Sequence, residues 1–284
     1  MSCFKPQLAQ FQSNTFQKMI DKMGITEDNP EFMVEEKLDG ERMQMHMMED
    51  ESVAGGYRFA FFSRKGKDYT YLYGTGFEDR GSSALTVHIR KAFDARLRNI
   101  ILDGEMIEWD YDPESGRDSM AGFGTLKTAA NQQIKNAFKE GSRPLFKIFD
   151  CLFCNDQDIT KYSLRERRKV LESVVKDVHR RIEIHPSDPK KTVKDIEDVL
   201  LEVIDTAGEG LVLKNPLSTY RLNERNDNWM KVKPEYMNEF GENLDCVVIG
   251  GYMGSGKRGG NMSSFLCGLR AEHDSRGKPA IHMF

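Results

Sequence analysis

One lysine stands in a segment whose residue types and spacing could support covalent catalysis. Lys37 opens the hexapeptide Lys37-Leu38-Asp39-Gly40-Glu41-Arg42, with strand-like segments on both sides. These flanks favour a tight hairpin turn at Asp39-Gly40 that projects Lys37 and Arg42 toward one cleft. A lysine there can act as a nucleophile if desolvation and neighbouring cations favour its free amine. The alternative is a hairpin with ordinary surface charges.

Four further segments follow in a fixed order, and each joins an apolar run to charged or aromatic residues. They are Leu102-Asp103-Gly104-Glu105, Phe146-Lys147-Ile148-Phe149-Asp150, Glu209-Gly210-Leu211-Val212-Leu213-Lys214 and Trp229-Met230-Lys231-Val232-Lys233-Pro234. With the lysine segment, they resemble motifs I, III, IIIa, IV and V of the covalent nucleotidyltransferases, which are the ATP-dependent DNA ligases, RNA ligases and mRNA capping enzymes. Ser63-Arg64 resembles an additional motif that ligases carry between motifs I and III.

The residues of motifs IV and V are similar to those of DNA ligases, whereas capping enzymes usually place Asp-Gly in motif IV. Glu36 to His46 and the tail Val248 to Tyr252 resemble the ligase IV group of eukaryotic DNA ligases more than ligases I or III. The resemblance runs from about Lys5 to about Ala271. A capping or RNA ligase relative remains an alternative, and so does a non-catalytic nucleotide-binding or DNA-end scaffold that has kept the motifs.

The resemblance implies a chemical role for each of these motif residues. Lys37 would take AMP from ATP, pass it to a DNA 5′-phosphate, and leave a 3′-hydroxyl to seal the nick. Leu38 would lie against the nucleotide, and Arg42 would hold its ribose or phosphate. Glu35 would accept from adenine N6, while Glu36 faces away because strand side chains alternate.

The remaining motif residues would serve the base, the phosphates and the DNA. Phe149 would stack on adenine, unless it is simply a buried core residue. Glu105 and Glu209 are oxygen ligands suited to Mg²⁺. Charge on the α-phosphate would be neutralised by Lys231 and Lys233, which lie two apart on a strand. Arg64 would bind the DNA 5′-phosphate.

Composition agrees with a protein that has a real core. The chain has 284 residues and is 39% hydrophobic, enough for one large domain or a domain plus a fragment. We expect an α+β fold, an ATP-grasp-like nucleotidyltransferase domain of mixed, largely antiparallel sheets with flanking helices, over residues 1–236. Residues 237–243 would form a hinge, and 244–284 the start of an OB fold. Motif VI, the N-terminal DNA-binding domain and the C-terminal BRCT repeats would lie outside this sequence.

The sequence and the resemblance also predict where the protein acts and what it binds. The sequence has no apolar run long enough for a membrane span and no signal peptide, which fits the cytosol or the nucleus, and the resemblance implies the nucleus. Its five scattered cysteines, including the lone Cys151-Leu-Phe-Cys154, favour a reducing compartment over disulfides or zinc. The resemblance implies broken or nicked DNA as substrate, nonhomologous end joining as the process, and an end-joining scaffold bound through the BRCT repeats. We expect this chain to be monomeric.

A formal net charge of −4 is unexpected for a chain that touches DNA, so local basic runs matter more. Arg64 to Lys67 and Lys257-Arg258 favour DNA, whereas Arg165 to Lys169 favours the solvated face of a surface helix. The segment Gly251 to Arg258 matches a phosphate-binding loop only in part, since Arg258 replaces the metal-binding Ser or Thr. A glycine-rich OB loop explains it better.

Periodicity predicts the main elements. Strand patterns lie near 32–37, 42–47, 57–63, 99–109, 144–154, 181–185, 210–214, 228–233 and 244–252. Helical spacing covers 85–97, 164–178 and 193–207, with Ser163 and Glu166 forming an N-terminal capping box and Gly208 stopping the last helix. The polar, turn-rich stretch 110–127 has no clear period and is expected to be a mobile surface insertion.

Overall fold

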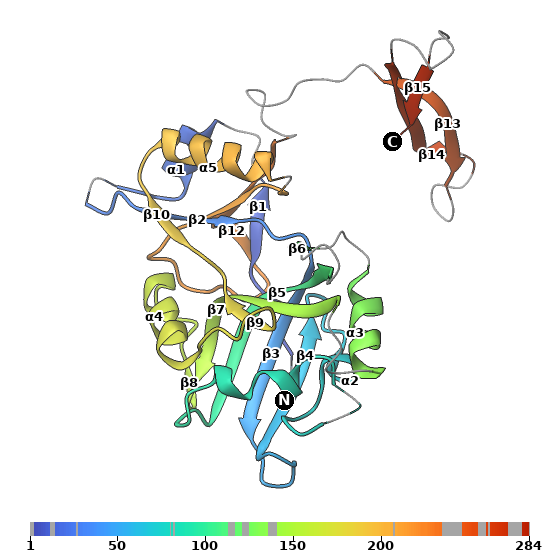
Figure 1. Cartoon of the computed structure of the whole chain (residues 1–284). Helices are drawn as coiled ribbons and strands as arrows, with labels where there is room; N and C mark the ends of the chain where they lie inside the picture. Colours follow the sequence, from blue (N-terminus) through green and yellow to red (C-terminus); the bar gives the residue numbers. More distant parts are fainter. Residues whose placement is uncertain are drawn as a thin grey trace. The chain divides into compact units, whose positions relative to one another are not determined.

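In a computed structural model, the chain forms two compact units, residues 1–237 and residues 238–284. It describes residues 3–11, 15–26, 28–79, 81, 83–112, 117–120, 125–135, 141–206, 208–234, 246–254, 260, 262–271 and 280–283. The predicted hinge at 237–243 lies outside these ranges, as does Lys257-Arg258. Figure 1 shows the elements in chain order.

The first unit is built on two sheets (Figure 1). The strands are β1 (Leu8–Phe11), β2 (Phe32–Glu36), β3 (Glu41–Glu49), β4 (Tyr57–Ser63), β5 (Asn99–Asp112), β6 (Arg117–Met120), β7 (Arg143–Cys154), β8 (Gln157–Asp158), β9 (Ile182–Ile184), β10 (Asp188–Lys190), β11 (Leu211–Lys214) and β12 (Arg225–Val232). The larger sheet has the order β4-β3-β5-β7-β8, with β6 paired to β5 and β9 to β7. The smaller sheet has the order β1-β12-β11-β2-β10. Apart from β1 with β12 and β7 with β9, all these pairs are antiparallel, so the predicted α+β class is confirmed.

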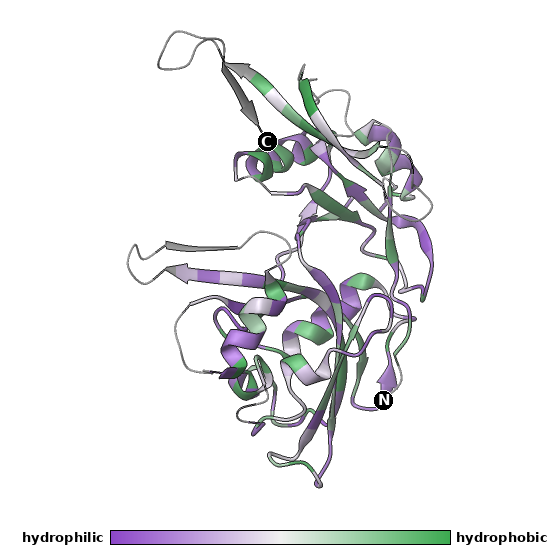
Figure 2. Ribbon diagram, turned by 90° about the vertical axis from the view of Figure 1, so that its right-hand side faces the viewer, coloured by the Kyte–Doolittle hydropathy of each residue, from purple (hydrophilic) through white to green (hydrophobic). Residues whose placement is uncertain are grey.

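Short helices flank both sheets. They are α1 (Phe16–Lys22), α2 (Thr70–Tyr73), α3 (Leu126–Lys135), α4 (Leu164–Val174) and α5 (Val193–Asp205). The predicted capping box of α4 is confirmed, because the Ser163 hydroxyl accepts from the backbone N–H of Glu166 and the Glu166 carboxylate accepts from that of Ser163. Hydrophobic and hydrophilic residues alternate along many elements in Figure 2, as one-sided burial requires.

Alternation along β3 and β5 separates the core from the site. Met43, Met45 and Met47 on β3 pack into the main hydrophobic core, together with Leu102 and Met106 on β5. Their neighbours, beginning with Arg42 on β3 and Asp103 and Glu105 on β5, therefore point to the opposite face of the sheet. The core thus supports a rigid surface that carries charged groups.

The predicted hairpin at Asp39-Gly40 is wrong. β2 pairs with β10 and β11 in the smaller sheet, whereas β3 pairs with β4 and β5 in the larger one. The segment around Gly40 is therefore a crossing between the sheets. A Cβ at Gly40 would lie 2.5 Å from the Met106 carbonyl oxygen, so glycine is needed for close approach to β5 rather than for a turn.

Three local predictions are also corrected. The expected helix over 85–97 is two single 3₁₀ turns, η1 (Thr86–His88) and η2 (Arg90–Ala92). The expected helix over 164–178 ends at Val174, because Val175 is extended and bridges to Phe93. Parts of 110–127 are regular, since β5 extends to Asp112 and pairs antiparallel with β6, and α3 begins at Leu126.

The basic run Arg165 to Lys169 is not a uniformly solvated face. Arg165 and Lys169 are exposed, but Arg167 is fully buried and Arg168 is 8% exposed. Arg167 forms a two-pronged pair with the buried carboxylate of Asp150 on β7, with N···O distances of 2.8 and 2.7 Å. The pair ties α4 to the strand that carries Phe149.

The second unit contains a three-stranded antiparallel sheet, β13 (Val247–Met253), β14 (Met262–Ala271) and β15 (Ala280–Met283). Gly251 to Met253 belongs to β13, while 255–259 of the glycine-rich segment lies outside the described ranges. In the described part of the chain, none of the helices is both long and apolar enough to cross a membrane. The five cysteines are free thiols.

Candidate active site

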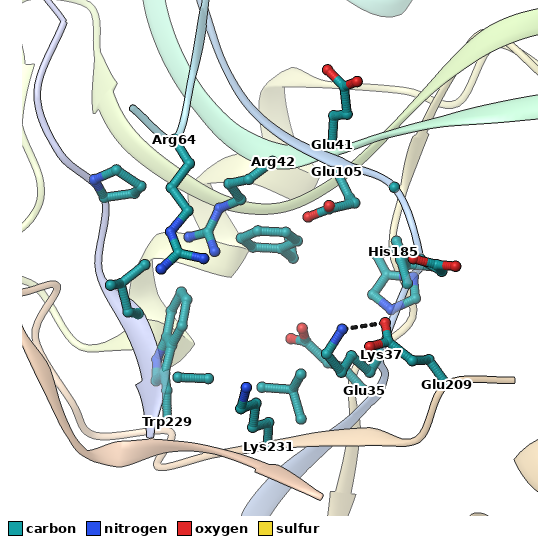
Figure 3. A pocket seen from close by; sticks show the side chains of 18 of the residues that line it. Glu35, Lys37, Glu41, Arg42, Arg64, Glu105, His185, Glu209, Trp229 and Lys231 are labelled. Carbon is teal, nitrogen blue, oxygen red and sulfur yellow. Dashed lines mark hydrogen bonds and ion pairs between the residues drawn. The ribbon is translucent and has the colours of Figure 1, made fainter. Parts of the chain in front are cut away.

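A cavity of about 1100 Å³ in the first unit gathers the residues singled out from the sequence. Its lining comes from both sheets and from the segment that joins β2 to β3 (Figure 3). The ten predicted site residues all line it: Glu35, Lys37, Leu38, Arg42, Arg64, Glu105, Phe149, Glu209, Lys231 and Lys233. Residues nearly 200 positions apart in the sequence thus meet in one place.

Lys37 lies at the centre of a charged cluster (Figure 3). Its Nζ donates to Oε2 of Glu209, and Lys233 Nζ lies 2.6 Å from the other carboxylate oxygen. Burial alone would raise the pKa of Glu209, but hydrogen bonds from Lys233 and Lys37 lower it. The group nearest to the Lys37 amine is therefore an anion rather than the expected cations.

Backbone geometry holds this cluster in register. The Lys37 N–H donates to the Gly210 carbonyl oxygen at 2.8 Å, which continues the pairing of β2 with β11 beyond the strand end. Gly210 has a φ of +132°, and a Cβ there would lie 2.2 Å from the Val232 carbonyl oxygen. Only glycine fits this position, so Glu209 and Lys37 are placed side by side by the backbone.

Lys231 lies on the opposite side of the cavity from Arg42 in Figure 3. Partial burial is the main cause that lowers the pKa of Lys231, and the positive charges of Lys37, Arg225 and Lys233 lower this pKa further. The expected concentration of cations is therefore present. These positive charges lower the pKa of Lys231, whereas Lys233 is paired with Glu209.

The Arg42 guanidinium already forms hydrogen bonds within the protein, in addition to its predicted role of holding the ribose or phosphate of the nucleotide. Its Nε and Nη2 lie 2.7 and 2.6 Å from the two carboxylate oxygens of buried Asp103, and Nη2 also donates to the Gln7 carbonyl oxygen at 3.2 Å. The Tyr220 hydroxyl donates to Asp103 at 2.6 Å. Asp103 thus fixes the guanidinium in the cavity wall, and the hydrogen bond to Gln7 ties the guanidinium to the segment before β1.

Phe149 reaches the cavity because β7 is bulged. Asp103 pairs with Asp150 and Gly104 with Ile148, which leaves Phe149 as the extra residue. The ring packs edge-on against Trp229, with centroids 6.1 Å apart. Arg42 Cζ and Lys214 Nζ lie 4.6 and 4.4 Å from its centroid. The ring is 7% exposed, so it is both a packing residue and part of the wall.

Glu35 is buried in an ion pair with Lys214, at 2.5 Å between Oε2 and Nζ. Burial opposes its ionisation, yet Lys214, His185 and Arg168 together lower the pKa of Glu35. Glu36 also contributes to the lining of the cavity, and its carbonyl oxygen lies 2.8 Å from Nε2 of His185. A Cβ at Gly208 would lie 3.1 Å from Oε1 of Glu36, and the expectation that the Glu36 side chain faces away from the cleft stays a prediction.

The pKa of Glu105 lies well above the ordinary value for a carboxyl group. Burial raises its pKa to about 7, although the positive charges of Arg42 and Lys37 oppose the shift. The folded chain therefore prefers the neutral carboxyl, and the stability contributed by this preference is lost as the pH rises from the unfolded pKa of 4.5 through about 7.

Glu105→Gln should therefore stabilise the protein at pH 8 by on the order of 1 to 3 kcal/mol and change little at pH 4. Thermal unfolding of both proteins at the two pH values, in the absence of divalent cations, checks this. Equal gains at the two pH values would mean that the amide improves packing instead of removing a costly charge.

Arg64 lines the cavity beside the turn that follows β4, with Lys65 and Lys67. Lys5 and Arg225 add further positive charge from the segments of β1 and β12. The net charge of −4 thus conceals a basic cavity, because many acidic residues lie elsewhere or are paired.

Several lining residues were not assigned a role from the sequence. Lys214 and Trp229 lie within quoted motifs, so their positions carried a signal. His185 follows a short strand and had none, and the same is true of Lys5 and Asn223. These residues are brought to the cavity by chain crossings that periodicity does not encode.

A family model, the ATP dependent DNA ligase domain, matches residues 6–233. Curated relatives include DNA ligase 4 of Neurospora crassa, 59% identical over 275 residues that cover 96% of this chain and 26% of that protein. DNA ligase 4 of Coccidioides immitis is 60% identical over 273 residues, covering 96% of this chain and 27% of that protein. The chain spans about a quarter of the length of these relatives.

Solved structures share the fold at low sequence identity. A mycobacterial DNA ligase D complexed with ATP and MES is 21% identical with a TM-score of 0.50, covering 94% of this chain and 68% of that chain. A Lig E DNA ligase is 18% identical with a TM-score of 0.50, covering 98% of this chain and 83% of that chain. The family match spans the residues that build both sheets and the cavity, and this chain belongs to the ATP-dependent DNA ligase domain family.

Proposed function

We propose that the cavity adenylates Lys37 from ATP and that the adenylate is then used to seal DNA. The observation that carries this proposal is the placement of Lys37 among Glu209, Lys231 and Lys233 in a cavity that also holds Glu105. A surface hairpin lysine would not lie among so many chemically matched groups. The similarity to DNA ligase 4 proteins supports DNA over RNA as the acceptor.

In the first step, the Lys37 amine releases its contact with Glu209, loses a proton to water and attacks the α-phosphorus of ATP. A phosphoramidate bond forms and the bond to pyrophosphate breaks, so AMP is left on Nζ. Lys231 and Lys233 neutralise charge on the phosphate oxygens as it develops. Phe149 and Trp229 supply aromatic surface for the base, and Arg42 offers a guanidinium already held in place by Asp103.

A divalent cation fits the chemistry of the donors. The described residues contain no cluster of three or more His, Cys, Asp or Glu side chains suited to a metal. Glu105 and Glu209 nevertheless line one cavity, and Mg²⁺ commonly uses only one or two carboxylates with phosphate and water oxygens. When bound, Mg²⁺ would supply positive charge near the α-phosphate.

The later steps extend this proposal to DNA. AMP moves from Lys37 to a 5′-phosphate, and attack by a 3′-hydroxyl then releases AMP and closes the backbone. Arg64 and the other basic lining residues would contact phosphate. The DNA ligase 4 relatives favour nonhomologous end joining in the nucleus, with a scaffold protein recruited through BRCT repeats outside this chain. We expect the chain itself to be a monomer that does not bind membranes.

The test compares ATP with GTP as the nucleotide, and a nicked DNA duplex with an RNA 5′-end as the acceptor. Label at the α-phosphate of ATP, but not of GTP, should become bound to protein, and the purified adenylate should pass it to a nicked DNA duplex rather than to an RNA 5′-end. Transfer from GTP would instead indicate a capping enzyme. No transfer from either nucleotide would favour a non-catalytic scaffold.

Glu209→Gln should reduce the adenylation rate at least about 100-fold while changing ATP affinity less than about threefold, because the carboxylate acts near the phosphate rather than at the base. Single-turnover labelling beside calorimetry measures both quantities. Glu172→Gln on the exposed face of α4 is the matched control. Parent-like labelling by Glu209→Gln would remove this carboxylate from the reaction.

A further inference from the structure

A second, smaller cavity lies between α4 and the edge of the smaller sheet at β10 (Figure 1). Its volume is about 230 Å³, and none of its lining residues lines the larger cavity. Small-molecule sites commonly occupy about 300 to 1,000 Å³, so this space suits one side chain or a small anion better than a nucleotide. Arg168 lines it and lies 3.8 Å from Glu35, measured from Nη1 to Oε1, so one guanidinium lies between the two cavities.

Three lining residues have hydrogen-bonding groups that the described part of the chain does not use. Ser187 lies just before β10, and its buried Oγ has no hydrogen-bond partner among the described residues. Lys169 on α4 is exposed, and within the described ranges its ammonium group forms no hydrogen bond or ion pair. Arg165 donates to Glu31 through Nη2 at 3.0 Å, which leaves Nε and Nη1 for another acceptor.

Helical spacing places the two cations together. Arg165 and Lys169 are four residues apart on α4, so their side chains share one face of that helix. Ser187 contributes a hydroxyl from another wall, and rotation about its Cα–Cβ bond changes the direction of that hydroxyl. Apolar surface comes from Met33, Leu164 and Pro189. Donors and apolar atoms thus line one small space.

The charges around this cavity favour an anion. Glu31 is paired with two cations, Arg165 at 3.0 Å and Lys191 at 3.8 Å. Glu172 lies 3.7 Å from Nε of Arg168, so these two charges largely offset each other. The lysine on the exposed face of α4 adds a further positive charge. The mouth therefore has more positive than negative charge, although the whole chain is acidic.

We propose that this cavity, which we call the α4 recess, binds a phosphoserine side chain of a protein segment. A phosphomonoester carries a charge of about −1.5 to −2 at pH 7 and three acceptor oxygens, one for each of Ser187, Lys169 and Arg165. A carboxylate has a single charge and two oxygens, so it would leave one donor without a partner. Clusters of basic side chains recognise phosphorylated peptides in the same way.

The test measures binding to the whole chain by calorimetry. The probes are a pentapeptide of four alanines around one phosphoserine, with blocked ends, the same peptide without phosphate, and inorganic phosphate. The phosphopeptide should bind at least about fivefold more tightly than inorganic phosphate, because the apolar lining also contacts its carbon atoms. The peptide without phosphate should not bind.

Two substitutions remove one donor each. Lys169→Gln should weaken phosphopeptide binding at least about tenfold, because a charge-assisted hydrogen bond is lost, whereas Lys18→Gln on the exposed face of α1 should not weaken it. Ser187→Ala should also cost about tenfold and leave thermal unfolding unchanged, because its hydroxyl has no partner to lose within the described part of the chain. Ser173→Ala, on the exposed surface of α4, is the matched control.

The basic lining of the larger cavity is another possible place for a phosphate, and Arg64→Gln separates the two sites. If Arg64→Gln removes phosphopeptide binding and Lys169→Gln does not, the peptide binds in the larger cavity and the proposal is overturned. Equal affinity for inorganic phosphate and phosphopeptide would assign the α4 recess to a free anion, which overturns a protein segment as its occupant. No binding of the phosphopeptide at millimolar concentration overturns the site itself.

Discussion

Lys37→Ala should abolish covalent adenylation, with labelling falling at least about 10⁴-fold to background, because the neighbouring amines of Lys231 and Lys233 are assigned to the phosphate charge rather than to the attack on phosphorus. Lys37→Arg should be equally inactive, since a guanidinium stays protonated and has no lone pair to attack phosphorus. The measurement is protein-bound label from α-labelled ATP after a single turnover. Thermal unfolding should show both variants folded, because Lys37 is partly exposed and not a core residue.

Lys194→Arg provides the matched control for this experiment. Lys194 lies on the exposed surface of α5, where its partner is Asp198. The control should label like the unchanged protein. Persistent label on Lys37→Ala would show that another residue carries AMP, and activity of Lys37→Arg would show that Lys37 contributes only positive charge.

Asp150→Ala should destabilise the first unit by about 3–5 kcal/mol, the cost of leaving a buried charge without its partner. Arg167 and Asp150 are both fully buried, and Arg167 also donates to the carbonyl oxygens of Tyr162 and Ser218. Loss of the carboxylate would loosen α4 from β7 beside Phe149. Denaturant unfolding with an unchanged slope measures the effect.

Asp198→Ala is the comparison that separates burial from charge. Asp198 on α5 pairs with Lys194, and their side chains are 55% and 78% exposed. This substitution should cost no more than about 1 kcal/mol, because water screens an exposed pair. Similar losses for Asp150→Ala and Asp198→Ala would contradict the view that the buried pair anchors α4.

Part of the site could be read from the sequence because several of its residues stand beside strand ends. Alternating and apolar runs located the eight predicted strands of the first unit, and charged residues that adjoin the ends of some of these runs, such as Lys37, Glu209 and Lys233, line the cavity. Motif resemblance then supplied roles for Lys37, Glu105 and Glu209. Local spacing is sufficient for such residues, because a strand end determines both position and direction.

The rest depended on contacts between distant segments. Apolar spacing over 85–97 suggested a helix, but those side chains enter the core from single 3₁₀ turns. Charge alone placed Arg167 and Arg168 in solvent, whereas their partners Asp150 and the Phe149 backbone lie on another element. No local sequence pattern identifies His185, because its place is set by a contact with the carbonyl oxygen of Glu36, a residue far away in the sequence, and by the cavity that it lines.

The most direct test is the mass of the intact protein after incubation with ATP and Mg²⁺, followed by peptide mapping. The account predicts a gain of one AMP, located on Lys37 and removed by excess pyrophosphate, which reverses the first step. AMP on any other residue, or no gain under conditions where the protein is folded and binds ATP, would contradict the claim that this cavity is an adenylation site.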